Sequence, residues 1–177
     1  RQTCRRSADR TEVETAVLVA RVGHLVAEIP EIDRAIVSTD SKEIADVAGN
    51  SGLNVPFYRP DDLSGDRISD LEVLTHALTE MEKLDETTYD IVVMLQLTSP
   101  LRRTEHVRDT IQKLIDGDWD AVWTVSETDS KNHPLKQLTV NDERLDYYDQ
   151  SGKQIIARQQ LVPVYHRNGV AYAIRRS

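Results

Sequence analysis

The stretch from Val92 to Arg102, VVMLQLTSPLR, constrains the possible folds of this chain more than any other. It begins as an apolar run of strand length and ends abruptly in polar residues and a proline. In an open α/β sheet, ligands bind just beyond the carboxyl ends of the strands, which is where Gln96, Thr98 and Ser99 would then lie. A buried strand closed by a turn rich in Ser and Pro explains the same pattern, and this segment alone leaves both interpretations open.

Strand-like and helix-like patterns alternate on either side of this stretch. Apolar or β-branched runs predict strands over residues 32–39, 55–58, 90–96 and 120–126. Apolar stripes at helical spacing predict helices over residues 11–28, 40–49, 68–83 and 104–117. The first ten residues lack periodicity and are predicted to be irregular, with a capping box at Thr11 and Glu14 and an N-cap at Asp40. This alternation favours an α/β fold with a three-layer, mostly parallel sheet.

The pattern changes after Ser126. Residues 135–140 and 144–148 read as two strands around the turn Asn141-Asp142, which predicts a β-hairpin inserted into the α/β core. Because projecting hairpins commonly form dimers, we expect a dimerisation arm over about residues 127–160. Residues 170–174 read as a final strand that returns to the sheet. No repeat or linker divides the sequence, so we predict one domain over residues 1–177.

Composition narrows the class of protein. A hydrophobic fraction of 39% and a charged fraction of 29% are typical of soluble globular proteins. The net charge of -8 argues against a general nucleic-acid binder, although a nucleotide substrate needs only a few local cations. A single cysteine, Cys4, excludes an internal disulfide and favours a reducing compartment, so we expect a cytoplasmic protein. With neither a membrane-length apolar run nor a visible secretory signal, we expect no membrane partner.

Several blocks of sequence, taken in order, carry a resemblance to a known family. Together they resemble the CMP-sialic acid synthetases, also called acylneuraminate cytidylyltransferases, over about residues 32–176. The blocks are Ile36 to Asp40, Arg59-Pro60 with Gly65, Asp66 and Ser69, Leu95 to Arg102, His133 to Lys136, and Arg158 to Leu161 leading to Asn168 to Tyr172. Any one block is weak, whereas five in the right order are a specific signal.

This resemblance implies a fold of the nucleotide-diphosphosugar transferase type and a chemical reaction. CTP and a nonulosonic acid would give the CMP-sugar and pyrophosphate, with magnesium as cofactor and a homodimer as the assembly. By analogy, Arg59 and Ser69 would face the cytidine, and Gln96 would lie within reach of both nucleotide and sugar. The remaining sugar contacts would come from Asn168, Tyr172, Lys136 and Arg158, the last two approaching the sugar carboxylate.

Each of these roles has a structural alternative. Arg59 also reads as an ordinary loop arginine, Ser69 as a helix cap, Tyr172 as a packed strand aromatic and Lys136 as a solvated charge. The functional interpretation requires Gln96 to converge with Arg59, Asn168 and Tyr172 on one cleft above the sheet. No residue is assigned as a catalytic group or as a metal ligand.

Two family motifs do not occur in this sequence. The family opens with a Gly-rich loop that holds the triphosphate, whereas no glycine precedes Gly23 here, and its acidic metal-binding motif is not found before Ser177. We therefore expect this polypeptide alone not to turn over CTP. The alternatives are an inactive family member that acts as a binding or assembly module, and a sugar-1-phosphate nucleotidyltransferase. The sugar would be a neuraminic, legionaminic or pseudaminic acid, or a shorter keto-deoxy acid, which fits less well because that branch places a carboxylate where Thr98 stands.

Overall fold

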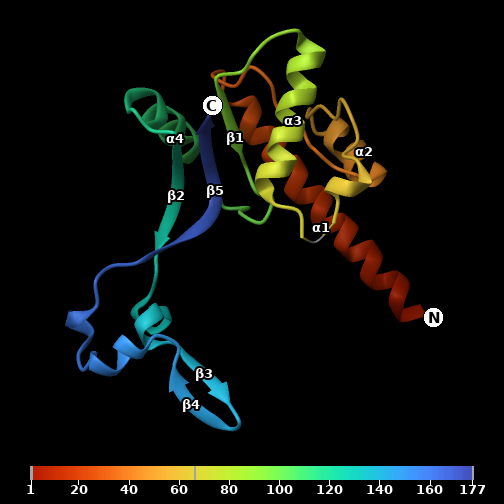
Figure 1. Cartoon of the computed structure of the whole chain (residues 1–177). Helices are drawn as coiled ribbons and strands as arrows, with labels where there is room; N and C mark the ends of the chain where they lie inside the picture. The colour runs from red at the N-terminus through yellow and green to blue at the C-terminus, as the bar shows by residue number, and fades with distance from the viewer. Residues whose placement is uncertain (1, 66, 177) are drawn as a thin grey trace. The chain divides into compact units, whose positions relative to one another are not determined.

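A computed structural model describes residues 2–65 and 67–176, with side chains from Thr15 onward. The described chain forms a mixed α/β fold (Figure 1). Its helices are α1 (Gln2–Ala27), α2 (Lys42–Asn50), α3 (Asp70–Asp85) and α4 (Thr104–Asp116). Its strands are β1 (Ile91–Met94), β2 (Ala121–Glu127), β3 (Leu138–Asn141), β4 (Arg144–Tyr147) and β5 (Tyr165–Arg175).

The chain divides into two compact units. The sheet unit comprises the described residues up to Thr124 together with those from Gly169 onward. The hairpin unit comprises Val125–Asn168 and includes the segment expected to form the arm. The expectation of one domain with an arm stays a prediction.

The sheet has the strand order β1-β5-β2. β5 pairs antiparallel with β1, and Met94 lies opposite Tyr172 in that register. The prediction of a mostly parallel sheet is therefore not confirmed for these strands. The difference arises because the last strand enters between β1 and β2, which are joined by α4 in the manner expected of an α/β unit.

The first two predicted strands form less structure than expected. In the described chain, segment 32–39 forms one isolated parallel bridge, between Ile36 and Asn54, the residue just before segment 55–58. The Val37 N–H donates to the Asn54 carbonyl at 2.9 Å. Pro56 follows closely and has no N–H to continue a ladder.

The core of the sheet unit surrounds β1 and the turn that follows it. One buried cluster contains Ile29, Val107, Ile111 and Ala171, and Val93 and Leu95 pack against it. A second cluster contains Val19, Ala48 and Leu53, and Leu97 packs against that one. The central stretch of the sequence thus contacts both clusters, which fixes the backbone where Gln96 leaves the strand.

The beginning of the chain differs from the prediction. α1 starts at Gln2, so residues 2–10 are helical rather than irregular, and Thr11 lies inside the helix rather than in a capping box at its start. The segment contains neither Gly nor Pro, and arginine, alanine and glutamine favour helix even without an apolar stripe. Among the described helices, none combines the length and the apolar character that a membrane crossing requires.

The hairpin unit contains the antiparallel pair β3–β4. Its turn is at Asp142 and Glu143, which both have positive φ, one residue later than predicted. The first strand starts at Leu138 rather than at residue 135, because Pro134–Lys136 forms a short 3-10 helix. Val140 and Leu145 face each other across the hairpin and are both about two-thirds exposed, at 68% and 69%.

Candidate functional site

The turn after β1 is held by the side chain of Arg102, which is only 9% exposed. Its Nη2 donates to the carbonyls of Gln96 at 2.6 Å and Gly169 at 2.9 Å, and its Nε donates to the carbonyl of Val170. Within the described chain no carboxylate pairs with this guanidinium, and burial lowers the pKa of Arg102. One arginine thereby joins the end of β1 to the middle of β5.

Gly169 lies where Gln96 meets β5. Its φ of +70° belongs to the left-handed region that favours glycine. A Cβ at this position would lie 2.5 Å from Gln96 Oε1 and 2.9 Å from Ser99 Oγ. Both polar side chains therefore occupy the space that the missing side chain leaves, as expected where a strand glycine permits a close approach.

Tyr172 completes this corner of the sheet unit. Its ring is 5% exposed and makes an edge-to-face contact with Trp123, with ring centroids 5.6 Å apart. Its hydroxyl accepts a hydrogen bond of 3.0 Å from the Gly169 N–H. The structure thus brings both Gln96 and Tyr172 close to Gly169, and the packed-aromatic alternative describes the ring of Tyr172.

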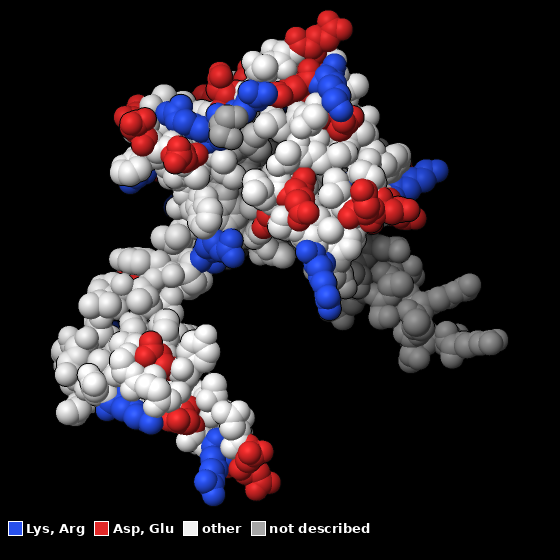
Figure 2. All heavy atoms as spheres, viewed as in Figure 1, with Lys and Arg blue, Asp and Glu red and all other residues white. Residues whose placement is uncertain are grey.

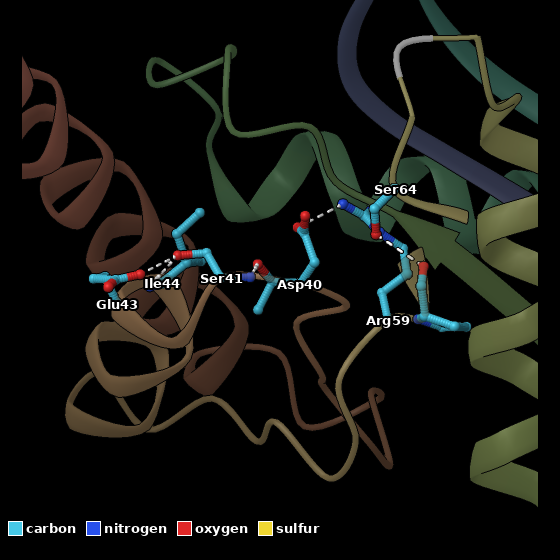
Figure 3. Close-up of polar contacts among 8 residues, drawn as sticks. Asp40, Ser41, Glu43, Ile44, Arg59 and Ser64 are labelled. Carbon is cyan, nitrogen blue, oxygen red and sulfur yellow. Dashed lines mark hydrogen bonds and ion pairs between the residues drawn. The ribbon is translucent and has the colours of Figure 1, made fainter. Parts of the chain in front are cut away.

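Arg59 forms a second polar group in the sheet unit (Figure 3). Its Nη2 lies 3.2 Å from Asp40 Oδ1, and its Nε donates to Ser64 Oγ at 3.3 Å. The prediction that Asp40 caps α2 is wrong: Ser41 Oγ accepts from the Ile44 N–H, while the Asp40 carboxylate pairs with Arg59. No described hydrogen bond joins Arg59 to Gln96, so convergence of these two residues stays a prediction.

Ser69 is the N-cap of α3. Its hydroxyl accepts from the Glu72 N–H at 3.3 Å and donates to Glu72 Oε2 at 2.6 Å. The Ser69 N–H also donates to that carboxylate, which completes a capping box and lowers the pKa of Glu72. The capping alternative is therefore confirmed, whereas a contact with cytidine stays a prediction.

The other three predicted site residues belong to the hairpin unit. Lys136 ends a 3-10 helix and Arg158 begins another; both side chains are exposed and have no partner among the described contacts. Arg158 also lines a pocket of about 440 Å³, together with His133 and Asp129. Asn168 donates from Nδ2 to Ser126 Oγ at 3.1 Å.

His133 is a buried polar residue that belongs to one of the family blocks but was given no site role from the sequence. Its Nδ1 accepts from the Leu135 N–H at 3.1 Å, so its Nε2 carries the proton that points to the Val162 carbonyl, also at 3.1 Å. These two hydrogen bonds tie the 3-10 segment that carries Lys136 to the segment beside Arg158. In sequence it stands directly before Pro134, and it is the N-cap of the 3-10 helix Pro134–Lys136.

The described residues do not fit a preassembled metal centre. Nowhere in the described chain do three or more His, Cys, Asp or Glu side chains gather closely enough to hold an ion. Magnesium commonly keeps several waters and takes phosphate oxygens with only one or two carboxylates. No described side chain is therefore assigned as a metal ligand.

Comparison with known proteins agrees with the motifs at this corner. The profile of the cytidylyltransferase family matches residues 15–176, and the chain belongs to this family. The curated matches confirm the resemblance to the CMP-sialic acid synthetases. The family assignment therefore covers both polar groups of the sheet unit and the whole hairpin unit.

Three relatives illustrate the similarity. The CMP-N,N'-diacetyllegionaminic acid synthase of Legionella pneumophila is 38% identical over 80 residues, covering 45% of this chain and 34% of that protein. The N-acylneuraminate cytidylyltransferase of Streptococcus agalactiae is 30% identical over 136 residues, covering 77% of this chain and 31% of that protein. The pseudaminic acid cytidylyltransferase of Campylobacter jejuni is 27% identical over 141 residues, covering 79% and 59%. The chain thus spans about a third of the length of the first two relatives.

Proposed function

We propose that this chain supplies substrate contacts of a cytidylyltransferase that activates a nonulosonic acid with CTP. The observation that carries the proposal is the corner where the Gln96 side chain meets Gly169, at the carboxyl end of β1. A primary amide there offers both a donor and an acceptor, which suits a cytosine edge or a sugar hydroxyl. The names of the relatives support CTP and a nonulosonic acid as the substrates.

The proposed reaction is an in-line displacement at the α-phosphate. The anomeric hydroxyl of the sugar acid gives its proton to water and its oxygen forms a bond to the α-phosphorus. The bond from the α-phosphorus to the oxygen that bridges to the β-phosphorus breaks, and pyrophosphate leaves with that oxygen. Catalysis of such a step depends mainly on positioning and on compensating charge on the phosphates. Magnesium would arrive with the triphosphate and supply part of that charge.

The assigned residues would serve as binding groups. Arg59, which now pairs with a half-exposed carboxylate, would turn toward the cytidine together with Ser69. Gln96, Asn168 and Tyr172 would contact the sugar acid. Lys136 and Arg158 are exposed cations without a described partner, and they would pair with the sugar carboxylate.

We also propose that the hairpin unit is a dimerisation arm. Figure 2 shows charged side chains of both signs toward the hairpin end of this unit, and uncharged surface between and above them on the face drawn. Seven of its apolar residues are at least half exposed, namely Leu138, Val140, Leu145, Tyr148, Ile156, Val162 and Tyr165. Exposed apolar surface of this extent marks an interaction site, and a second copy would cover it. The same surface favours the alternative in which the chain acts as an assembly module. The three-layer, mostly parallel fold stays a separate proposal, for the whole protein.

A ligand panel tests the proposed function. Thermal unfolding of the chain is measured with CTP, UTP and dTTP, each with and without N-acetylneuraminic acid. A cytidylyltransferase predicts a shift with CTP that exceeds the shifts with UTP and dTTP. Equal shifts with all three nucleotides would favour a sugar-1-phosphate nucleotidyltransferase, and no shift with any ligand would favour the assembly module.

A further inference from the structure

The described hydrogen bonds of the Arg102 side chain all go to backbone carbonyls. A buried guanidinium normally faces a carboxylate, because unpaired buried charge is costly. Arg102 instead bonds to the carbonyls of Gln96, Gly169 and Val170. In the part of the chain that the structure describes, no carboxylate compensates its charge. The burial of Arg102 therefore needs an explanation other than an ion pair.

The positions of the three carbonyls suggest that explanation. Both hydrogens of Nη2 are used, one on Gln96 of the turn after β1 and one on Gly169 of β5. These two carbonyls come from segments that are more than seventy residues apart in the sequence. A single planar nitrogen therefore fixes the distance between them, which a flexible side chain cannot do.

The same two residues also meet through a side chain. Gln96 Oε1 lies 2.5 Å from the position that a Cβ of Gly169 would take, and the Gly169 N–H donates to the Tyr172 hydroxyl. Fixing the Gln96 backbone against Gly169 thereby fixes the point from which the amide of Gln96 projects. Without this contact, the turn from Gln96 to Arg102 would be free to move the amide away from the strand.

We infer that Arg102 is a positioning residue, which clamps the Gln96 and Gly169 carbonyls and so aims the Gln96 amide at the substrate. This inference rests on the proposed function, since it assumes that Gln96 contacts a substrate. Lysine is not an adequate replacement, because one ammonium nitrogen cannot occupy the positions of both Nε and Nη2.

A double-mutant cycle tests the clamp. Affinity for CTP is measured by NMR titration for the unmodified chain, Gln96→Ala, Arg102→Lys and the double variant. We expect each single substitution to weaken CTP binding by about tenfold, and Arg102→Lys to change affinity by less than about twofold once Gln96 is alanine. Equal losses from Arg102→Lys in both backgrounds would mean that it acts through general stability, which would overturn the inference.

A second measurement needs no variant. In the unmodified chain, the Nη2 hydrogens of Arg102 should give separate, slowly exchanging signals, because both are bonded to carbonyls. Rapidly averaged guanidinium signals would overturn the clamp even if Arg102→Lys failed to fold.

The two ideas fail in different ways. If Gln96→Ala leaves CTP binding unchanged, the proposed role of Gln96 is wrong, while the separate Arg102 signals still report whether the clamp exists. If Gln96→Ala weakens binding and the Arg102 signals are averaged, the function stands and the positioning role does not.

Discussion

Replacing Gly169 with alanine should destabilise the chain by an amount that the geometry sets. The φ of +70° costs an L-residue about 1–2 kcal/mol. The new Cβ would also lie 2.5 Å from Gln96 Oε1 and 2.9 Å from Ser99 Oγ, which forces both side chains from their positions. Moving them off their preferred rotamers adds about 1 kcal/mol, for a total of about 2–3 kcal/mol.

Urea denaturation monitored by Trp fluorescence measures this difference. Because about 1.4 kcal/mol is a tenfold change in the equilibrium constant, the ratio of folded to unfolded chain should fall by roughly 30- to 150-fold, with the m-value unchanged. Gly49→Ala is the matched control: Gly49 lies in α2 with nothing within 4 Å of its Cβ position, so alanine there should stabilise by about 0.5–1 kcal/mol. A Gly169→Ala chain as stable as the unmodified one would refute the close approach of Gln96.

Three further predictions follow from contacts in both units. Val140→Lys should convert a dimer to a monomer in light scattering, whereas Thr139→Lys, on the other face of the hairpin, should leave the dimer intact. The proposed arm would be contradicted if both variants were dimers or both were monomers. Ser69→Ala should cost about 1 kcal/mol of unfolding free energy because α3 loses its capping box, and an unchanged urea midpoint would contradict that role. The pKa of Asp85 is lowered by the Tyr89 hydroxyl and by Arg34. The contribution of Asp85 to the unfolding free energy is therefore complete above its unfolded-state pKa of about 4 and is lost as the pH falls through the lower folded-state pKa. The stability gap between the unmodified chain and Asp85→Asn should therefore narrow in acid denaturation series, and a constant gap would contradict this linkage.

The sequence predicted the parts of the fold that periodicity controls. Helices α3 and α4 and strand β1 lie close to their predicted bounds, because apolar spacing and capping residues such as Ser69 act locally. Strand direction is not local: β5 enters the sheet antiparallel, which the alternation of strands and helices along the chain did not indicate.

The sequence pointed to some residues of the candidate site but not to the contacts that hold them. Gln96 and Tyr172 were identified from motifs, whereas Arg102 and Gly169, which hold them, lie in the same sequence blocks but were given no role. Only folding shows that the guanidinium is buried and that the glycine φ is positive, since both depend on segments about seventy residues apart. Asp40 was misassigned for a local reason: its neighbour Ser41 caps α2 instead.

The most direct test of the proposed site follows the side-chain amide of Gln96 by NMR as CTP is added to the chain. The account predicts that this signal and the Gly169 backbone N–H shift together and saturate, and that an equal concentration of UTP moves them less. A spectrum in which CTP leaves both signals unchanged, or in which UTP moves them equally, would contradict a cytidine-selective site at the corner between β1 and β5.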